Sequence, residues 1–130
     1  EGEWQSGDLV VLINEGSASA SEIVSSGIKD NERGTLYGET TFGTGTVLLP
    51  FDLSDGSMAL LGTKLWLTAD GNDIWKRGIA PDVTVSLEPG VSPNLPFEFR
   101  DRTITEEDLA AFEDGQLLKA YDGLQQTAGT

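Results

Sequence analysis

A run of small residues, Gly16-Ser17-Ala18-Ser19-Ala20-Ser21-Glu22, follows an apolar stretch and precedes an amphipathic one. This order predicts a serine nucleophile at the N-terminus of a helix. There, free backbone N–H groups and the helix dipole can stabilise the oxyanion that forms when a hydroxyl attacks a carbonyl carbon. A serine hydroxyl attacks efficiently only when a neighbouring base removes its proton. The chain contains no histidine, so the commonest base is missing.

The same residues also have a purely structural interpretation. Ser19 followed three residues later by Glu22 fits a capping box, in which both side chains satisfy N–H groups at the start of a helix. Helix capping alone therefore explains Ser19. Thr44 lies between Gly43 and Gly45 in a loop rich in glycine and threonine, and a loop residue without chemical role explains it equally.

The elements that would position Ser19 form the first half of an α/β unit. Residues 8–14 have a polar residue at each end and only leucine, valine and isoleucine between them. This run does not alternate with polar residues, which predicts a central strand covered on both faces. A helix should then start at the serine run and end between residues 30 and 34. Its expected apolar face consists of Ile23, Val24, Gly27 and Ile28. A short strand over 35–38 and a loop over 39–45 complete this unit.

Two longer apolar runs predict an antiparallel β-hairpin. Residues 47–53 and 58–68 are strand-like, and residues 54–57 (Ser-Asp-Gly-Ser) between them are typical of a turn. Residues 83–87 are expected to add a final edge strand.

The last third of the sequence predicts a connector and a C-terminal helix. Three prolines within 88–96 favour an extended segment, and Phe97 and Phe99 are expected to pin it to the core. The helix should begin at Thr105, with a break at Gly115. Its apolar members are Leu109, Phe112, Leu117, Leu118 and Tyr121.

The composition indicates a single folding unit and excludes several classes of function. A chain of 130 residues that is 38% hydrophobic can bury one core, so residues 1–124 are assigned to one domain or part of one and residues 125–130 to a frayed tail. The net charge of -14 disfavours binding to nucleic acid or to anionic membranes. Without cysteine or histidine, the sequence offers no disulfide, no metal constellation and no cofactor site.

Several segments, in this order, resemble the C-terminal processing peptidases, also called tail-specific proteases. The resemblance begins with Leu9-Val10-Val11-Leu12-Ile13-Asn14, the serine run through Ile23, and Gly38-Glu39-Thr40-Thr41-Phe42-Gly43. It continues with residues 53–56 and 78–83, and near the end with Asp114, Gln116, Leu117 and Ala120. Each segment is weak evidence by itself, but their shared order and spacing are specific to this family.

The resemblance implies a crotonase-like (ClpP/crotonase-type) α/β peptidase core, of which this chain is the C-terminal part, and a Ser/Lys dyad. It places the nucleophile at Ser19, the base at Thr44, and the glutamine that orients the base at Leu48. The Ala20 N–H would be one oxyanion donor. Threonine cannot act as a base near neutral pH, and leucine forms no hydrogen bond, so the chain is expected to lack its general base. Two such changes favour natural divergence over a single introduced substitution.

None of the four lysines replaces the missing base in the family pattern, since Lys29, Lys64, Lys76 and Lys119 all lie elsewhere. The resemblance thus implies a serine peptidase that cuts polypeptides near their C-termini, inactive in this chain. The alternative is a pseudopeptidase that binds peptide ends or acts in assembly. Polypeptides are the expected partners, self-association stays open, and the family's usual location is extracytoplasmic.

Overall fold

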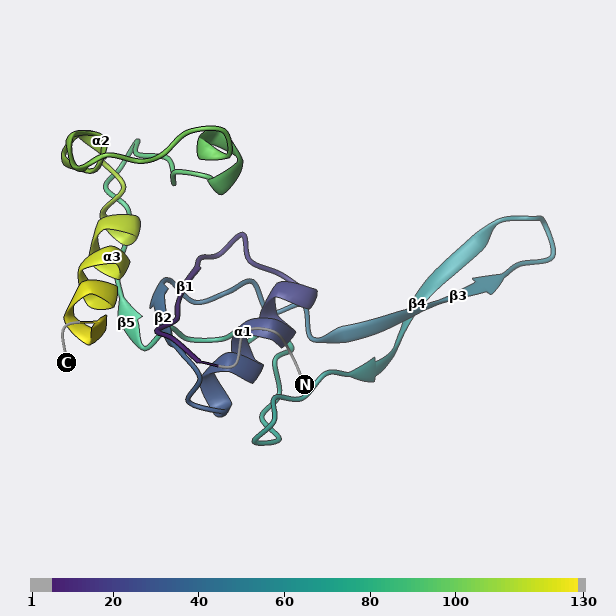
Figure 1. Cartoon of the computed structure of the whole chain (residues 1–130). Coiled ribbons are helices and arrows are strands. Elements are labelled where there is room, and N and C mark those ends of the chain that lie inside the picture. The colour runs from purple at the N-terminus through teal and green to yellow at the C-terminus, as the bar shows by residue number, and fades with distance from the viewer. Residues whose placement is uncertain (1–5, 129–130) are drawn as a thin grey trace.

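The computed structural model describes residues 6–128 and contains a three-stranded parallel sheet, a separate two-stranded hairpin and three α-helices among them. In the sheet the strand order is β1-β2-β5, and Figure 1 shows the sheet between helices α1 and α3. The elements of the first half are β1 (Val10–Ile13), α1 (Ala20–Asp30), β2 (Thr35–Gly38), β3 (Thr46–Asp52) and β4 (Met58–Leu65). Those of the second half are β5 (Val83–Thr84), the 3-10 helix η1 (Pro96–Phe99), α2 (Glu106–Ala111) and α3 (Gly115–Ala128).

The first strand, helix and second strand form at the predicted places, but the position of β1 in the sheet differs from the prediction. Within the described residues β1 pairs only with β2, so it is an edge strand and β2 is the central one. Ile13 is buried, whereas Leu12 is 42% exposed. An apolar run indicates a strand whose two faces are covered, but it does not determine which strands pair with it or which segments pack on its faces.

Helix α1 buries only part of its predicted apolar face, because Ile28 packs against the core whereas Ile23 and Val24 do not. Its buried side chains are Glu22, Ser25 and Ser26. Ile23 and Val24 are exposed, Val24 to 60%. Small and hydrogen-bonded side chains allow the helix to approach the neighbouring backbone closely, which a pattern of hydrophobicity does not predict.

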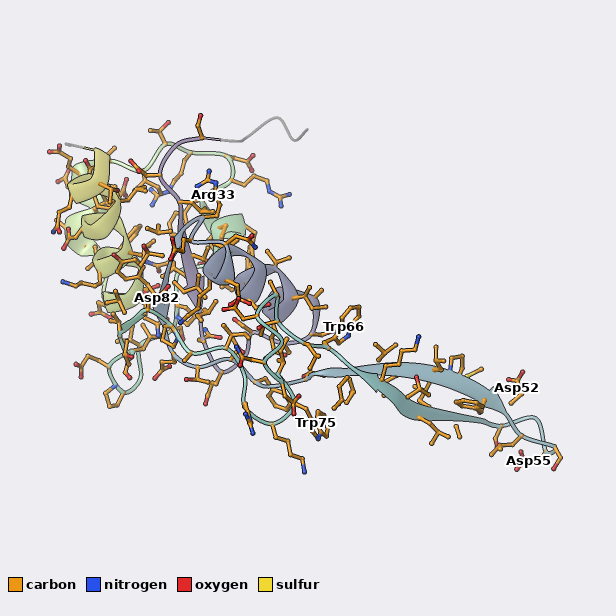
Figure 2. All side chains as sticks on the ribbon, turned by 90° about the horizontal axis from the view of Figure 1, so that it is seen from below. Arg33, Asp52, Asp55, Trp66, Trp75 and Asp82 are labelled. Atoms are coloured by element: carbon orange, nitrogen blue, oxygen red, sulfur yellow. The ribbon has the colours of Figure 1, made fainter. Side chains whose placement is uncertain are left out.

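The hairpin of β3 and β4 confirms the predicted antiparallel pairing. Its register runs from Asp52 opposite Met58 to Thr46 opposite Leu65, with an irregularity between Val47 and Leu48. Figure 1 shows the hairpin extending away from the rest of the molecule, and Figure 2 places Asp52 and Asp55 near its tip and Trp66 near its base. Apolar side chains stay exposed along it, including Leu49 and Leu60.

The C-terminal region contains two helices where the sequence predicted one. The chain leaves the helical conformation at residues 112–114, and α3 begins at Gly115. The observed break therefore lies just before Gly115, where the sequence predicted it. Helix α3 packs on β1 and β2, and the Gln116 side chain donates to the Val85 carbonyl at 2.8 Å. The helix continues to Ala128, so residues 125–128 of the predicted tail are helical, while residues 129–130 lie outside the described part.

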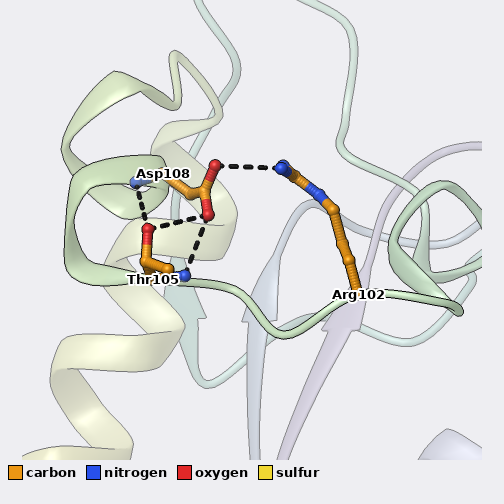
Figure 3. A network of polar contacts seen from close by, with 3 residues as sticks. All are labelled: Arg102, Thr105 and Asp108. Atoms are coloured by element: carbon orange, nitrogen blue, oxygen red, sulfur yellow. Dashed lines mark hydrogen bonds and ion pairs between the residues drawn. The ribbon is translucent and has the colours of Figure 1, made fainter.

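The connector before α2 is held differently from the prediction. Phe97 is 64% exposed and does not pin the segment to the core. Phe99 instead packs on Phe112, with ring centroids 5.3 Å apart. The start of α2 is closed by a capping box, because the Asp108 carboxylate accepts from the backbone and hydroxyl of Thr105 and also pairs with Arg102 at 3.1 Å (Figure 3).

None of the helices in the described range is long and apolar enough to span a lipid bilayer.

Candidate active site

Ser19 occupies a strained turn between β1 and α1. Its backbone angles, φ 57° and ψ -116°, lie where residues with a Cβ atom rarely occur. Such strain costs of order 1–3 kcal/mol and persists only where the surrounding structure enforces it, often at functional sites. The residue is exposed, and it forms a capping box with Glu22, whose carboxylate accepts from the Ser19 N–H at 2.9 Å. Its exposure leaves the hydroxyl within reach of a substrate, which the capping interpretation did not require.

The start of α1 provides a donor beside this hydroxyl. Ala20 is the first residue of the 11-residue helix. Within residues 6–128, no protein group accepts a hydrogen bond from its N–H. The N–H groups of a helix's first turn carry partial positive charge and favour a nearby anion. The position suits an oxyanion donor of the kind that acyl transfer needs.

Glu22 links the Ser19 turn to the loop that carries Thr44. Its side chain is fully buried. One carboxylate oxygen, Oε2, accepts from the backbone N–H groups of both Ser19 (2.9 Å) and Thr44 (2.7 Å). The other, Oε1, accepts from the Thr41 hydroxyl and the Gly43 N–H, both at 2.6 Å. The sequence predicts the bond to Ser19, but the three bonds to the loop were not predicted.

These bonds also set the charge state of Glu22. Burial alone raises the pKa of the carboxyl group, but the hydrogen bonds from Thr41, Gly43, Thr44 and Ser19 together outweigh it and hold the pKa below its usual range. Glu22 therefore stays ionised at neutral pH, as a buried anion surrounded only by donors. It is a positioning residue, because it fixes the loop relative to the serine turn.

Two further contacts hold the loop against its neighbours. The Phe42 N–H donates to the Ser17 carbonyl at 2.9 Å, next to the serine turn. The Thr41 hydroxyl, besides donating to Glu22, accepts from the Ile79 N–H at 2.7 Å. Gly43 has a positive φ of 89° and lies against the backbone of residues 76–78, where a Cβ atom would be crowded. Glycine at this position thus follows from packing.

The structure brings Thr44 close to Ser19 and places Leu48 on the hairpin. Thr44 is partly buried and shares the Glu22 carboxylate with Ser19. Leu48 lies on β3 opposite Gly62 and is 53% exposed. Neither side chain can accept a proton from a serine near neutral pH. The Gly-Thr-Gly loop therefore lies near the Ser19 turn but provides no side chain that could act as a base.

The four lysines have other positions in the described structure. Lys29 forms an ion pair with Asp82 at 2.9 Å and donates to the Ala80 carbonyl. Lys76 has its ammonium group 5.6 Å from the centre of the Trp75 ring. Lys64 pairs with Val47 in the hairpin, and Lys119 is exposed on α3. Residues 6–128 contain no cluster of acidic residues that could hold a metal ion.

The missed part of the site is the loop contact of Glu22. The sequence predicted Glu22 only as part of the helix cap. In the structure its carboxylate also accepts hydrogen bonds from the loop at Thr41, Gly43 and Thr44. The signal was the Gly43-Thr44-Gly45 segment, whose backbone N–H groups need an acceptor once the loop is buried.

Comparisons with known proteins identify a peptidase family. Residues 2–85 match the sequence model of Peptidase family S41. A probable CtpA-like serine protease of Staphylococcus aureus is 45% identical over 88 residues, 68% of this chain and 18% of that protein. The chloroplastic C-terminal processing peptidase of Tetradesmus obliquus is 47% identical over 85 residues, 65% of this chain and 18% of that protein.

A solved structure is similar as well. The photosystem II D1 C-terminal processing protease has a TM-score of 0.59 and 45% identity, covering 66% of this chain and 22% of that one. The matched part of this chain spans less than a fifth of the length of these two curated relatives.

Proposed function

Because the chain belongs to peptidase family S41, we propose that it is a C-terminal part of a C-terminal processing peptidase and carries the nucleophile Ser19 of a site that binds polypeptides near their C-termini. We further propose that the site turns over slowly or not at all in this chain. The observation that carries the proposal is the strained, exposed Ser19 at the start of α1.

The chemistry assigned to the site is acyl transfer. The Ser19 hydroxyl oxygen attacks the carbonyl carbon of the peptide bond, and the carbonyl electron pair moves onto oxygen, where the Ala20 N–H stabilises it. Collapse of this intermediate breaks the C–N bond as the nitrogen takes up a proton, so the amine leaves and an acyl-enzyme remains. Water then attacks the ester, which releases the carboxylic acid and restores the Ser19 hydroxyl. The first step requires a group that takes the Ser19 proton. Thr44 stands where that group is expected, so attack is slow and the bound substrate dissociates before it is cleaved.

The missing base favours a second role for the same site, the binding of polypeptide ends without turnover. Parallel strands β1 and β2, joined through α1, support the proposed crotonase-like core. An extracytoplasmic location is part of the proposal, supported by the chloroplastic location in one relative's name.

Parallel binding and cleavage assays test this function on the protein at its natural length. A fluorescent unstructured polypeptide is titrated to measure affinity, and its cleavage is followed by mass spectrometry, with Ser19→Ala as the control. We expect saturable binding in both proteins and no cleavage beyond the Ser19→Ala background. Absence of binding contradicts the assignment to polypeptides. Cleavage that disappears in Ser19→Ala shows that another group activates the serine, and contradicts the proposed inactivity.

A further inference from the structure

The hairpin of β3 and β4 is an apolar ribbon that lies away from the rest of the described structure. Figure 1 shows it extending beyond the sheet and the helices. On one face of β4 the side chains of Met58 and Leu60 are 59% and 61% exposed, and on the other face Leu61 is 52% exposed. An exposed apolar strand with unpaired backbone groups readily pairs with a strand of another chain. The outer edges of this ribbon are therefore candidates for an interface.

The two outer edges differ in the hydrogen bonds that they can form. Near the turn, the Leu53 N–H donates to the Ser57 carbonyl at 2.9 Å. Pro50 and Leu60 lie opposite each other three positions further along the ladder. Because bonded and non-bonded pairs alternate along antiparallel strands, the backbone groups of Pro50 and Leu60 point away from the partner strand.

This geometry leaves β4 as the open edge. Proline has no N–H, so Pro50 interrupts the outer edge of β3. Strand β4 contains no proline, and its outward positions Met58, Leu60 and Gly62 each have a free N–H and carbonyl direction on that side. Among residues 6–128, β4 pairs only with β3. Of the two edges, only that of β4 can therefore continue the sheet without interruption.

The charges of the hairpin indicate what pairs with this edge. Residues 46–65 contain one lysine and two aspartates, a net charge of -1 in a chain of -14. Figure 2 shows Asp52 and Asp55 near the tip, whereas Lys64 lies toward the base, opposite Val47. Two β4 strands that pair antiparallel bring Lys64 of each copy to the turn of the other, beside Asp55. A parallel pair would bring like charges together, which is unfavourable.

We propose that the outer edge of β4 pairs antiparallel with the same edge of a second copy of this chain. Leu60 lies on the twofold axis, opposite the same residue of the second copy, and Met58 lies opposite Gly62. The backbone groups of these three residues complete a ladder between the copies, which joins the two hairpins into one four-stranded sheet. The aspartates at the tip disfavour the other possible occupant of an apolar hairpin, a lipid bilayer.

This arrangement also keeps the acidic parts of the two copies apart. Strand β4 has eight residues and spans about 27 Å. Antiparallel pairing places the two bodies at opposite ends of the joined sheet, because each hairpin extends from its own body. Their separation exceeds the Debye length of about 8 Å at physiological ionic strength, so mutual repulsion is largely screened.

Sedimentation velocity on the protein at its natural length, over a wide range of concentration, tests the dimer. We expect a monomer–dimer equilibrium. Leu60→Pro removes the outward N–H at the centre of the interface without removing a hydrogen bond of the hairpin, and should raise the dimer dissociation constant at least tenfold. Leu60→Val keeps the N–H and is the matched control, which should stay within about threefold. A protein that is monomeric at every concentration overturns the proposal, including one that binds phosphatidylcholine vesicles instead.

Charge reversal tests the antiparallel register. Lys64→Glu and Asp55→Lys should each raise the dimer dissociation constant by about fivefold, because each brings like charges together at two symmetric places. The double variant again has opposite charges at both places and should return to near the value of the unmodified protein. Single variants that associate as the unmodified protein does contradict this register.

Cross-linking locates the interface without a proline. The 130 residues contain no cysteine, so Leu60→Cys introduces one thiol that faces the same thiol of the second copy. Paired strands bring these residues within the range of a disulfide, and mild oxidation should give a covalent dimer. Leu49→Cys, exposed on β3, is the matched control and should give little. Equal cross-linking of the two variants, or none in Leu60→Cys, overturns the proposal.

Discussion

At the scale of single residues, Ser19 is held in a backbone conformation that glycine adopts more easily than serine. The turn keeps its hydroxyl exposed at the start of α1. A conformation that costs stability and is still maintained is better explained by placement of a side chain than by helix capping, which needs no positive φ.

Substitution of Ser19 separates strain from chemistry. Ser19→Gly relieves the strain, whereas Ser19→Ala keeps a Cβ atom, so the glycine variant should be more stable than the alanine variant by roughly 1 kcal/mol. Urea unfolding measures the difference. Ser21→Gly, within the helix, is the control and should lower stability. If Ser19→Gly is less stable than Ser19→Ala, the backbone at position 19 is not strained as described.

Glu22 accounts for the position of the loop and should be the most sensitive carboxylate of the site. All four groups around it are donors, so the amide of Glu22→Gln brings an NH₂ group against N–H and O–H groups. We expect Glu22→Gln to lower the free energy of unfolding by roughly 2–4 kcal/mol. Glu15→Gln, at an exposed position, should change it little. Equal effects of the two substitutions in urea unfolding would contradict this role.

The lowered pKa of Glu22 predicts how stability changes with pH. A carboxyl group whose pKa is lower in the folded than in the unfolded chain stabilises the fold when it is ionised. That contribution is complete above the unfolded pKa of about 4.3 and is lost as the pH falls through the folded pKa. Unfolding free energies measured between about pH 6 and pH 3 should therefore decrease toward acid.

The decrease with acid should be smaller in Glu22→Gln than in the unmodified protein. Asp82 contributes in the same direction, since burial raises its pKa but the Leu36 N–H and Lys29 outweigh that and lower it, so part of the acid dependence remains. An identical pH profile in both proteins would show that Glu22 is not the buried anion described.

At the scale of elements, the sequence predicted the positions of strands and turns better than it predicted which residues are buried. The strand over 35–38 and the hairpin appear where residue types and turn signals predicted them. The buried face of α1 and the exposure of Phe97 did not follow, because both depend on which segment packs there. The candidate site likewise has one part that the sequence predicted and one part that it did not. Ser19 and the glycine loop were visible as motifs, but the buried carboxylate between them joins residues far apart in sequence.

In the monomer, the hairpin of β3 and β4 should be the least protected of the paired elements. A two-stranded ribbon that lies away from the body has little to stabilise it beyond its own pairing. Hydrogen exchange of dilute, monomeric protein followed by mass spectrometry should give faster exchange for 46–65 than for β1 and β2. Equal protection would mean that the hairpin is covered within the monomer.

At the scale of the whole molecule, two regions meet at one site. The part that matches peptidase family S41 provides the serine turn and the loop, and the C-terminal helices close a cavity beside them. Residue types predicted the first part through a family resemblance. The cavity was not predictable, because it arises between segments that are nearly a hundred residues apart and contain no motif of their own.

We propose that Ser19 is placed for attack and lacks a base and the group that would orient it. Thr44→Lys and Leu48→Gln introduce both. Hydrolysis of a quenched fluorescent polypeptide is measured for the unmodified protein, for Thr44→Lys, for the double variant, and for the double variant with Ser19→Ala. We expect a rate increase of at least a hundredfold in the double variant, a smaller increase in Thr44→Lys, and loss of the double variant's activity with Ser19→Ala. A double variant that stays folded, binds the polypeptide and still fails to cleave it would show that Ser19 is not placed for attack.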